Sequence, residues 1–148
     1  IDDTYNSSPE AMQAAIRLLS RQPTAASRIL VTGDMLELGA SAPGCHENIG
    51  VSAAEAGIDR VLAVGQFASH VASNAIAAGI ERDRATAFET IEALCGRLSK
   101  VIKDGDVLLV KGSRSMRMER VIDWLKNHSR AEATVQKQDN VPVVLRDR

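Results

Sequence analysis

The chain has 148 residues, of which 45% are hydrophobic, and this size and composition suit one domain with a single core. Its 18 basic and 19 acidic residues give a formal net charge of -1, which argues against nucleic-acid or membrane-surface partners because these require a basic face. No apolar run approaches the roughly 20 residues of a transmembrane helix and no signal peptide is recognisable, so we expect a cytoplasmic protein.

The first part of the chain is expected to form strand, helix, strand and a weaker helix. Residues 1–5 suit the end of a strand, and Ser7 with Glu10 fits a capping box at a helix start. The following apolar residues have the spacing of one buried helical face: Met12, Ala15, Ile16 and Leu19. The β-branched run 28–32 predicts a buried strand, and residues 46–56 predict an alanine-rich helix.

The second part of the chain continues this alternation. Residues 60–65 and 107–110 predict buried strands, and residues 86–88 predict a shorter one. Helical stripes follow each of them, and their apolar residues are Phe67, Val71, Ala75 and Ala78, then Phe88, Ile91, Leu94, Cys95, Leu98 and Ile102, then Met118, Val121, Ile122 and Leu125. The pattern predicts an α/β protein with a mostly parallel sheet of about six strands between two layers of helices.

One domain is expected over residues 1–130. The segment 131–148 loses helical periodicity, so we expect a flexible tail or a strand that pairs at a sheet edge. Ligands of open α/β sheets bind at the carboxyl ends of the strands. The loops after Gly33 and after Lys111 should therefore lie together and carry the function.

A short basic loop follows the strand at 107–110. Lys111, Ser113 and Arg114 concentrate hydrogen-bond donors that suit a small anion such as a carboxylate. The alternative is a solvated basic turn. The sequence lacks the GxxxxGK[ST] and GxGxxG spacings, so neither a triphosphate loop nor a dinucleotide loop is predicted.

Three other polar residues lie near the expected ligand edge. Asp34 could bind ribose hydroxyls, or it could serve as a turn or capping aspartate. Asn6 could contact a base edge or only cap the first helix. His46 is either a ligand contact or a helix-start and packing residue. The only cysteines, Cys45 and Cys95, indicate neither a disulfide framework nor a zinc site.

Five stretches taken together resemble the C-terminal domain of the Mur ligase family. They are DDTYNSSP (2–9), VTGDMLELG (31–39), CHENIG (45–50), AGIDRVLAVG (56–65) and VLLVKGSRSMRMERV (107–121). The resemblance runs in order from residue 1 to about residue 128. It implies a Rossmann-like domain of an ATP-dependent amide ligase of peptidoglycan synthesis. Such a ligase adds D-alanyl-D-alanine to UDP-N-acetylmuramoyl-tripeptide through an acyl phosphate.

The resemblance also implies that this chain is one part of a monomeric enzyme. In the family, N-terminal and central domains precede the matching region, and the central domain holds most of the ATP and Mg²⁺ site. The chain begins at Ile1 without an initiator methionine, which fits a fragment that is inactive alone. Other Mur ligases, folylpolyglutamate synthase and a standalone small-ligand binding module are the alternatives.

The resemblance assigns roles to matching positions of this sequence. Asn6 and Asp34 match nucleotide-contacting positions. The loop thought to approach the dipeptide is matched by Lys111, Ser113 and Arg114. His46 matches a position without a fixed role and is kept as a candidate substrate contact, and no metal ligand is predicted. Two departures from the family pattern are Ser7-Ser8, where Ala-Asn is usual, and Ser115, where Gly is common.

Overall fold

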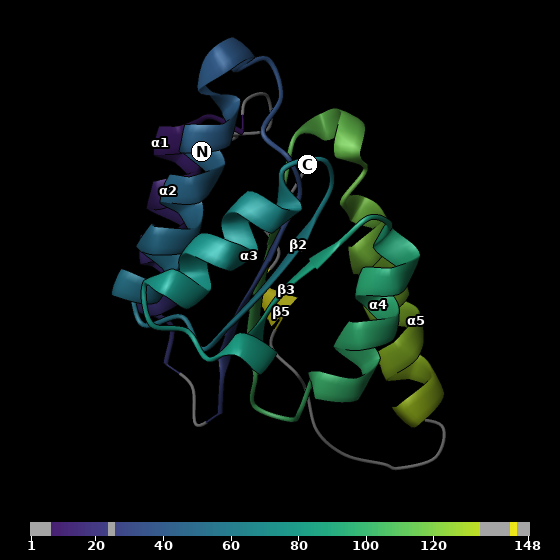
Figure 1. Cartoon of the computed structure of the whole chain (residues 1–148). Coiled ribbons are helices and arrows are strands. Elements are labelled where there is room, and N and C mark those ends of the chain that lie inside the picture. Colours follow the sequence, from purple (N-terminus) through teal and green to yellow (C-terminus); the bar gives the residue numbers. More distant parts are fainter. Residues whose placement is uncertain (1–6, 24–25, 134–142, 145–148) are drawn as a thin grey trace.

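The computed structural model describes residues 7–23, 26–133 and 143–144, in which a five-stranded sheet lies between two layers of helices (Figure 1). All neighbouring strands pair in parallel, in the order β3-β2-β1-β4-β5. The strands are β1 (Arg28–Thr32), β2 (Arg60–Val64), β3 (Ala85–Phe88), β4 (Val107–Lys111) and β5 (Val143–Val144). The predicted α/β architecture with a parallel sheet is confirmed.

The number of strands depends on the two ends of the chain. The sequence predicts about six, one of them over residues 1–5, which lie outside the described residues. β5 lies in the segment 131–148 and pairs with β4 at one edge of the sheet, through Val143 beside Leu108 and Val144 beside Leu109.

The helices divide between the two faces of the sheet. One face is covered by α1 (Pro9–Ser20), α2 (Ala42–Glu55) and α3 (Ala68–Ala77), and the other by α4 (Ile91–Val101) and α5 (Glu119–Ala133) (Figure 1). Three 3-10 turns complete the described part: η1 (Gly39–Ser41), η2 (Arg82–Arg84) and η3 (Arg114–Met116). α5 is the last described helix, and it ends at Ala133.

The three central strands, β1, β2 and β4, contribute side chains to both cores. Successive strand residues point to opposite faces of a sheet. In β1, Leu30 packs with the core under α1, α2 and α3, whereas Ile29 and Val31 pack with the core under α4 and α5. Because both faces are covered, the strands are apolar along their length instead of alternating.

The first helix begins one residue later than the capping-box pattern predicts. The N-cap is Ser8, whose Oγ accepts a hydrogen bond from the N–H of Ala11 at 3.1 Å. Pro9 explains the shift, because the residue before a proline is restricted to extended backbone. Ser8 has φ -74° and ψ 157°, which is the conformation of an N-cap.

The strand order creates a topological switch point between β1 and β4. From β1 the chain continues to β2 and β3 on one side, and then returns to form β4 on the other side of β1. The loops that follow β1 and β4 therefore start side by side and lead to opposite faces of the sheet. Open α/β sheets bind their ligands at such a point. Among the described helices, none combines the length and apolarity needed to cross a bilayer.

Candidate functional site at the carboxyl edge of the sheet

Hydrogen bonds join the loops after β1 and β4. The N–H of Gly33 donates to the carbonyl of Lys111 at 2.8 Å, and the N–H of Ser113 donates to the carbonyl of Asp34 at 3.0 Å. The N–H of Leu36 then donates to Ser113 Oγ at 2.9 Å. The two loops meet as the sequence predicts, and the Ser113 hydroxyl is held by the backbone that follows β1.

Gly112 allows these loops to approach closely. A Cβ at Gly112 would lie 2.8 Å from Met118 Cγ and 3.1 Å from the Cα of Gly33, closer than packed atoms tolerate. Met118 is buried just before α5 and closes the contact from that side. The glycine of the basic loop therefore serves packing at the switch point.

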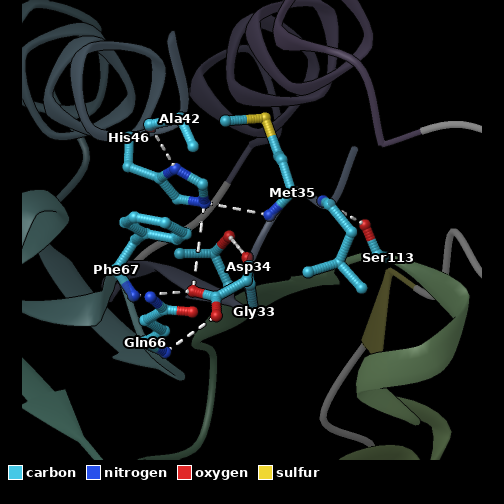
Figure 2. A network of polar contacts seen from close by, with 10 residues as sticks. Gly33, Asp34, Met35, Ala42, His46, Gln66, Phe67 and Ser113 are labelled. Carbon is cyan, nitrogen blue, oxygen red and sulfur yellow. Dashed lines mark hydrogen bonds and ion pairs between the residues drawn. The ribbon is translucent and has the colours of Figure 1, made fainter. Parts of the chain in front are cut away.

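The carboxylate of Asp34 is directed at the N-terminus of α3 (Figure 2). The residue is 4% exposed; Oδ2 accepts from the N–H of Gln66 at 2.7 Å, and Oδ1 accepts from the N–H of Phe67 at 3.0 Å. Gly65 makes room for it, since it has φ +123° and a Cβ there would lie 2.5 Å from Oδ2. These contacts agree with the alternative of a turn or capping aspartate, since the two N–H groups belong to the residues just before α3. Contact between Asp34 and a nucleotide ribose stays a prediction.

His46 is buried beside Asp34 and does not lie among the exposed groups of the edge. It is 1% exposed, and its ring stacks on Phe67 with centroids 4.7 Å apart and planes at 23° (Figure 2). Nδ1 lies 2.6 Å from the carbonyl of Ala42, and Nε2 accepts from the N–H of Met35 at 2.9 Å. Both ring nitrogens are therefore in use, and direct substrate contact by His46, as predicted from the sequence, does not fit this geometry.

Three of the four predicted substrate-binding residues follow one another at the end of β4. Lys111 and Ser113 are half-buried, and Arg114 is exposed at the start of η3. Arg117 has φ +53°, and this left-handed residue ends η3 before α5 begins. Two cationic side chains and a hydroxyl on one short loop suit a carboxylate or phosphate ligand. Asn6, the other predicted nucleotide contact, lies outside the described residues.

The sequence analysis missed the residues that organise this edge through backbone groups. Met35 and Leu36 contribute N–H groups to His46 and Ser113, and Gln66 and Phe67 contribute theirs to Asp34. Side-chain type gives no signal for such contacts. The glycine that ends the second buried strand does mark the loop after β2 as part of the same edge.

The cysteines and the acidic residues do not form a further centre in the described part of the chain. Across residues 7–23, 26–133 and 143–144, no group of three or more His, Cys, Asp or Glu side chains is placed to hold a metal ion. Burial raises the pKa of the Cys95 thiol, and the nearby Glu92 carboxylate raises it further. Cys45 is half-buried on the opposite face, so the two thiols are separated by the sheet.

Comparison with known proteins identifies the family. The family model described as Mur ligase, glutamate ligase domain, matches residues 1–114. The chain belongs to the Mur ligase family. The resemblance predicted from the sequence is thereby confirmed, and the Mur ligase match includes β1, β2, β3, β4 and all the predicted site residues.

Individual Mur ligases are similar over most of the chain. It is 42% identical over 130 residues to UDP-N-acetylmuramoyl-tripeptide–D-alanyl-D-alanine ligase of Escherichia coli, covering 86% of this chain and 27% of that protein. The ligase of the same name from Bacillus subtilis is 34% identical over 122 residues, covering 82% and 26%. The crystal structure of MurF ligase from Thermotoga maritima in complex with ADP has a TM-score of 0.70 and 30% identity, covering 90% and 29%. The chain thus spans about a quarter of the length of the curated relatives it matches.

Proposed function

We propose that this chain is the C-terminal domain of a UDP-N-acetylmuramoyl-tripeptide–D-alanyl-D-alanine ligase. The full enzyme would work in the cytoplasm, in peptidoglycan synthesis, and this domain would close over a site formed with the N-terminal and central domains. Relatives that carry this name at 42% and 34% identity support the assignment over other Mur ligases and over a standalone binding module.

The observation that carries the proposal is the construction of the switch-point edge. Ser113 and Arg114 lie on a loop that is fixed to the backbone after β1, where ligands of this class of fold bind. Lys111 and Arg114 would attract the carboxylate of D-alanyl-D-alanine or a phosphate group, and Ser113 would orient it. Holding the dipeptide amine against the activated carboxyl group lowers the entropic cost of amide formation.

The basic residues of this edge suit the phosphate groups of ATP. ATP, when bound, supplies the phosphoryl group that activates the carboxyl group of the tripeptide. The basic groups of residues 111–114 suit its phosphates, and the relative from Thermotoga maritima contains ADP. Magnesium prefers several oxygen ligands including carboxylates, and the described residues offer no such cluster. As the resemblance to the Mur ligases implies, Mg²⁺ would be bound mainly by the central domain of the full enzyme.

A domain exchange tests the proposal. This chain would replace the matching 27% of the Escherichia coli ligase, to which it is 42% identical. We expect the chimera to release phosphate from ATP only when both the tripeptide substrate and D-alanyl-D-alanine are present, because the edge of this domain would complete the site. The isolated chain should show no activity.

Matched assays separate the proposal from its rivals. L-alanyl-L-alanine and single amino acids serve as control substrates, and the melting transition of the chimera serves as the control for folding. A folded chimera that accepts L-glutamate or another amino acid in place of D-alanyl-D-alanine would assign the chain to a different ligase. A folded chimera that ignores every amine would favour a binding module.

A further inference from the structure

The hydrogen bonds of His46 fix its tautomer. A backbone N–H can only donate and a carbonyl oxygen can only accept. Because the N–H of Met35 donates to Nε2 at 2.9 Å, Nε2 carries a lone pair; because Nδ1 faces the carbonyl of Ala42 at 2.6 Å, Nδ1 carries the proton. The ring is therefore neutral, with its proton on Nδ1.

With its proton on Nδ1, His46 does not form an ion pair with the neighbouring Asp34. His46 Nε2 and Asp34 Oδ1 lie 3.9 Å apart, and an ion pair would require a proton on Nε2. The N–H of Met35 already occupies that lone pair, and Oδ1 receives its hydrogen bond from Phe67. The two side chains thus bind two different loops (Figure 2). His46 accepts a hydrogen bond from the loop after β1, and Asp34 accepts two from the loop after β2.

His46 connects α2 to the loop that holds Ser113. Its Nδ1 bond reaches back to Ala42 in the first turn of α2, so the ring is anchored to the helix at one nitrogen. Its other nitrogen binds Met35, and the next N–H along the chain, that of Leu36, donates to Ser113 Oγ. Stacking on Phe67 fixes the plane of the ring. Rotation of the ring would therefore break the hydrogen bond to Met35, the residue next to the Leu36 N–H that binds the Ser113 hydroxyl.

We propose that neutral His46 is a positioning residue for Ser113, acting through the N–H groups of Met35 and Leu36. The role of Ser113 in the ligase reaction rests on the proposed function above. The geometry of the positioning itself does not, because every contact in it lies within this chain.

The first test measures the tautomer in the 148-residue chain. Long-range nitrogen–proton NMR of the imidazole distinguishes a protonated Nδ1 from a protonated Nε2. We expect a protonated Nδ1, an Nε2 with a free lone pair, and slow hydrogen exchange at the Met35 and Leu36 amides. A protonated Nε2, or rapid exchange at both amides, would overturn the proposal without any variant being made.

Two substitutions then separate the two bonds of the ring. In His46→Gln, the amide oxygen takes the place of Nε2 and keeps an acceptor for Met35. In His46→Asn, the shorter amide takes the place of Nδ1 and keeps a donor for Ala42, but the acceptor for Met35 is lost. We expect hydrogen exchange at the Met35 and Leu36 amides to be at least about tenfold faster in His46→Asn, because one hydrogen bond is lost. In His46→Gln the exchange rates should be nearly unchanged.

Kinetics of the same variants in the chimeric ligase tests the consequence for Ser113. We expect kcat/KM for D-alanyl-D-alanine to fall about tenfold or more in His46→Asn and to be largely restored in His46→Gln. A merely structural role predicts lower melting temperatures with an unchanged kcat/KM in the folded fraction, and equal losses in both variants would also contradict positioning. If the unmodified chimera is inactive, the proposed function fails while the NMR measurements still decide the role of His46.

Discussion

Arg114 differs from its neighbours in the basic loop by its exposure. Lys111 and Ser113 are half-buried, and Ser113 is tied by hydrogen bonds to the loop after β1, whereas the side chain of Arg114 reaches the surface at the start of η3. An exposed side chain at this position adds little to the packing of either core. Its removal should therefore affect function far more than stability.

We expect Arg114→Ala to lower the turnover of the chimeric ligase by about tenfold or more, because a charge-assisted contact with an anionic group is lost. The free energy of unfolding should change by only about 0.5 kcal/mol, the usual range for an exposed substitution. Phosphate release and urea denaturation measure the two effects.

Arg82→Ala provides the matched control for this prediction. Arg82 is an exposed arginine in η2. Because η2 precedes β3, Arg82 lies at the amino ends of the strands, away from the loops after β1 and β4. Its removal should leave turnover unchanged. Equal losses in both variants would mean that the basic loop contributes only general positive charge, which is the solvated-turn alternative.

Asp34 and His46 show the limit of prediction from sequence at this scale. The pattern of strands and glycines predicts that both residues lie near the carboxyl ends of the strands, and in the structure both are buried there, 4% and 1% exposed. The sequence pattern could not reveal how the two side chains are oriented, because the partners of Asp34 are N–H groups 32 and 33 residues away in the chain. A buried carboxylate that caps a helix and an exposed one that binds ribose have the same local sequence.

The packing of α2 on α3 depends on one glycine. A Cβ at Gly50 would lie 2.2 Å from the carbonyl oxygen of Val71 and 2.7 Å from the backbone nitrogen of Ala75. These are backbone atoms in the middle of α3, so they cannot rotate away as a side chain would. A methyl group at Gly50 therefore requires the two helices to separate.

We expect Gly50→Ala to destabilise the chain by about 1–3 kcal/mol, as overpacking of a close helix contact does. Gly96→Ala in α4 is the control, because a Cβ there meets no heavy atom within 4 Å. Relieving the entropy cost of a helical glycine should stabilise it by up to about 1 kcal/mol.

Urea denaturation followed by the fluorescence of the single tryptophan, Trp124, measures both variants. The same chemical change should thus have opposite signs in two helices. Stabilisation by both substitutions would show that α2 and α3 are not in close contact in solution.

Strands were easier to predict from this sequence than α2. The runs 28–32, 60–65 and 107–110 match β1, β2 and β4 within one residue, because strands buried on both faces leave continuous apolar runs between polar ends. α2 starts at Ala42 instead of 46. Its buried residues include Ala42, Gly50 and Ala53, and small residues of this kind give close packing without a strong hydrophobic stripe.

At the scale of the whole molecule, the described residues form two cores that share the strands β1, β2 and β4. The core under α1, α2 and α3 and the core under α4 and α5 take alternate residues of β1, β2 and β4. If the helices on one face detach, these strands lose half of their packing, and the core on the other face is weakened as well. We therefore expect the two layers to unfold as one cooperative unit.

Cys95 allows this expectation to be measured. It is 5% exposed in the core under α4 and α5, and burial raises the pKa of its thiol, so little reactive thiolate is present in the folded chain near neutral pH. In a Cys45→Ala variant, where Cys95 is the only thiol, labelling by a thiol reagent reports on that core alone. The circular dichroism of the helices reports on both layers.

We expect Cys95 to be labelled very slowly in the folded chain and to become reactive at the same urea concentration at which helical circular dichroism is lost. Coincident midpoints are the signature of a single transition, because the reagent then reaches the thiol only when the shared strands separate. Labelling of Cys95 well below that concentration, with most of the helical signal retained, would show that α4 and α5 detach first. The two faces of the sheet would then be separate folding units, despite the strands they share.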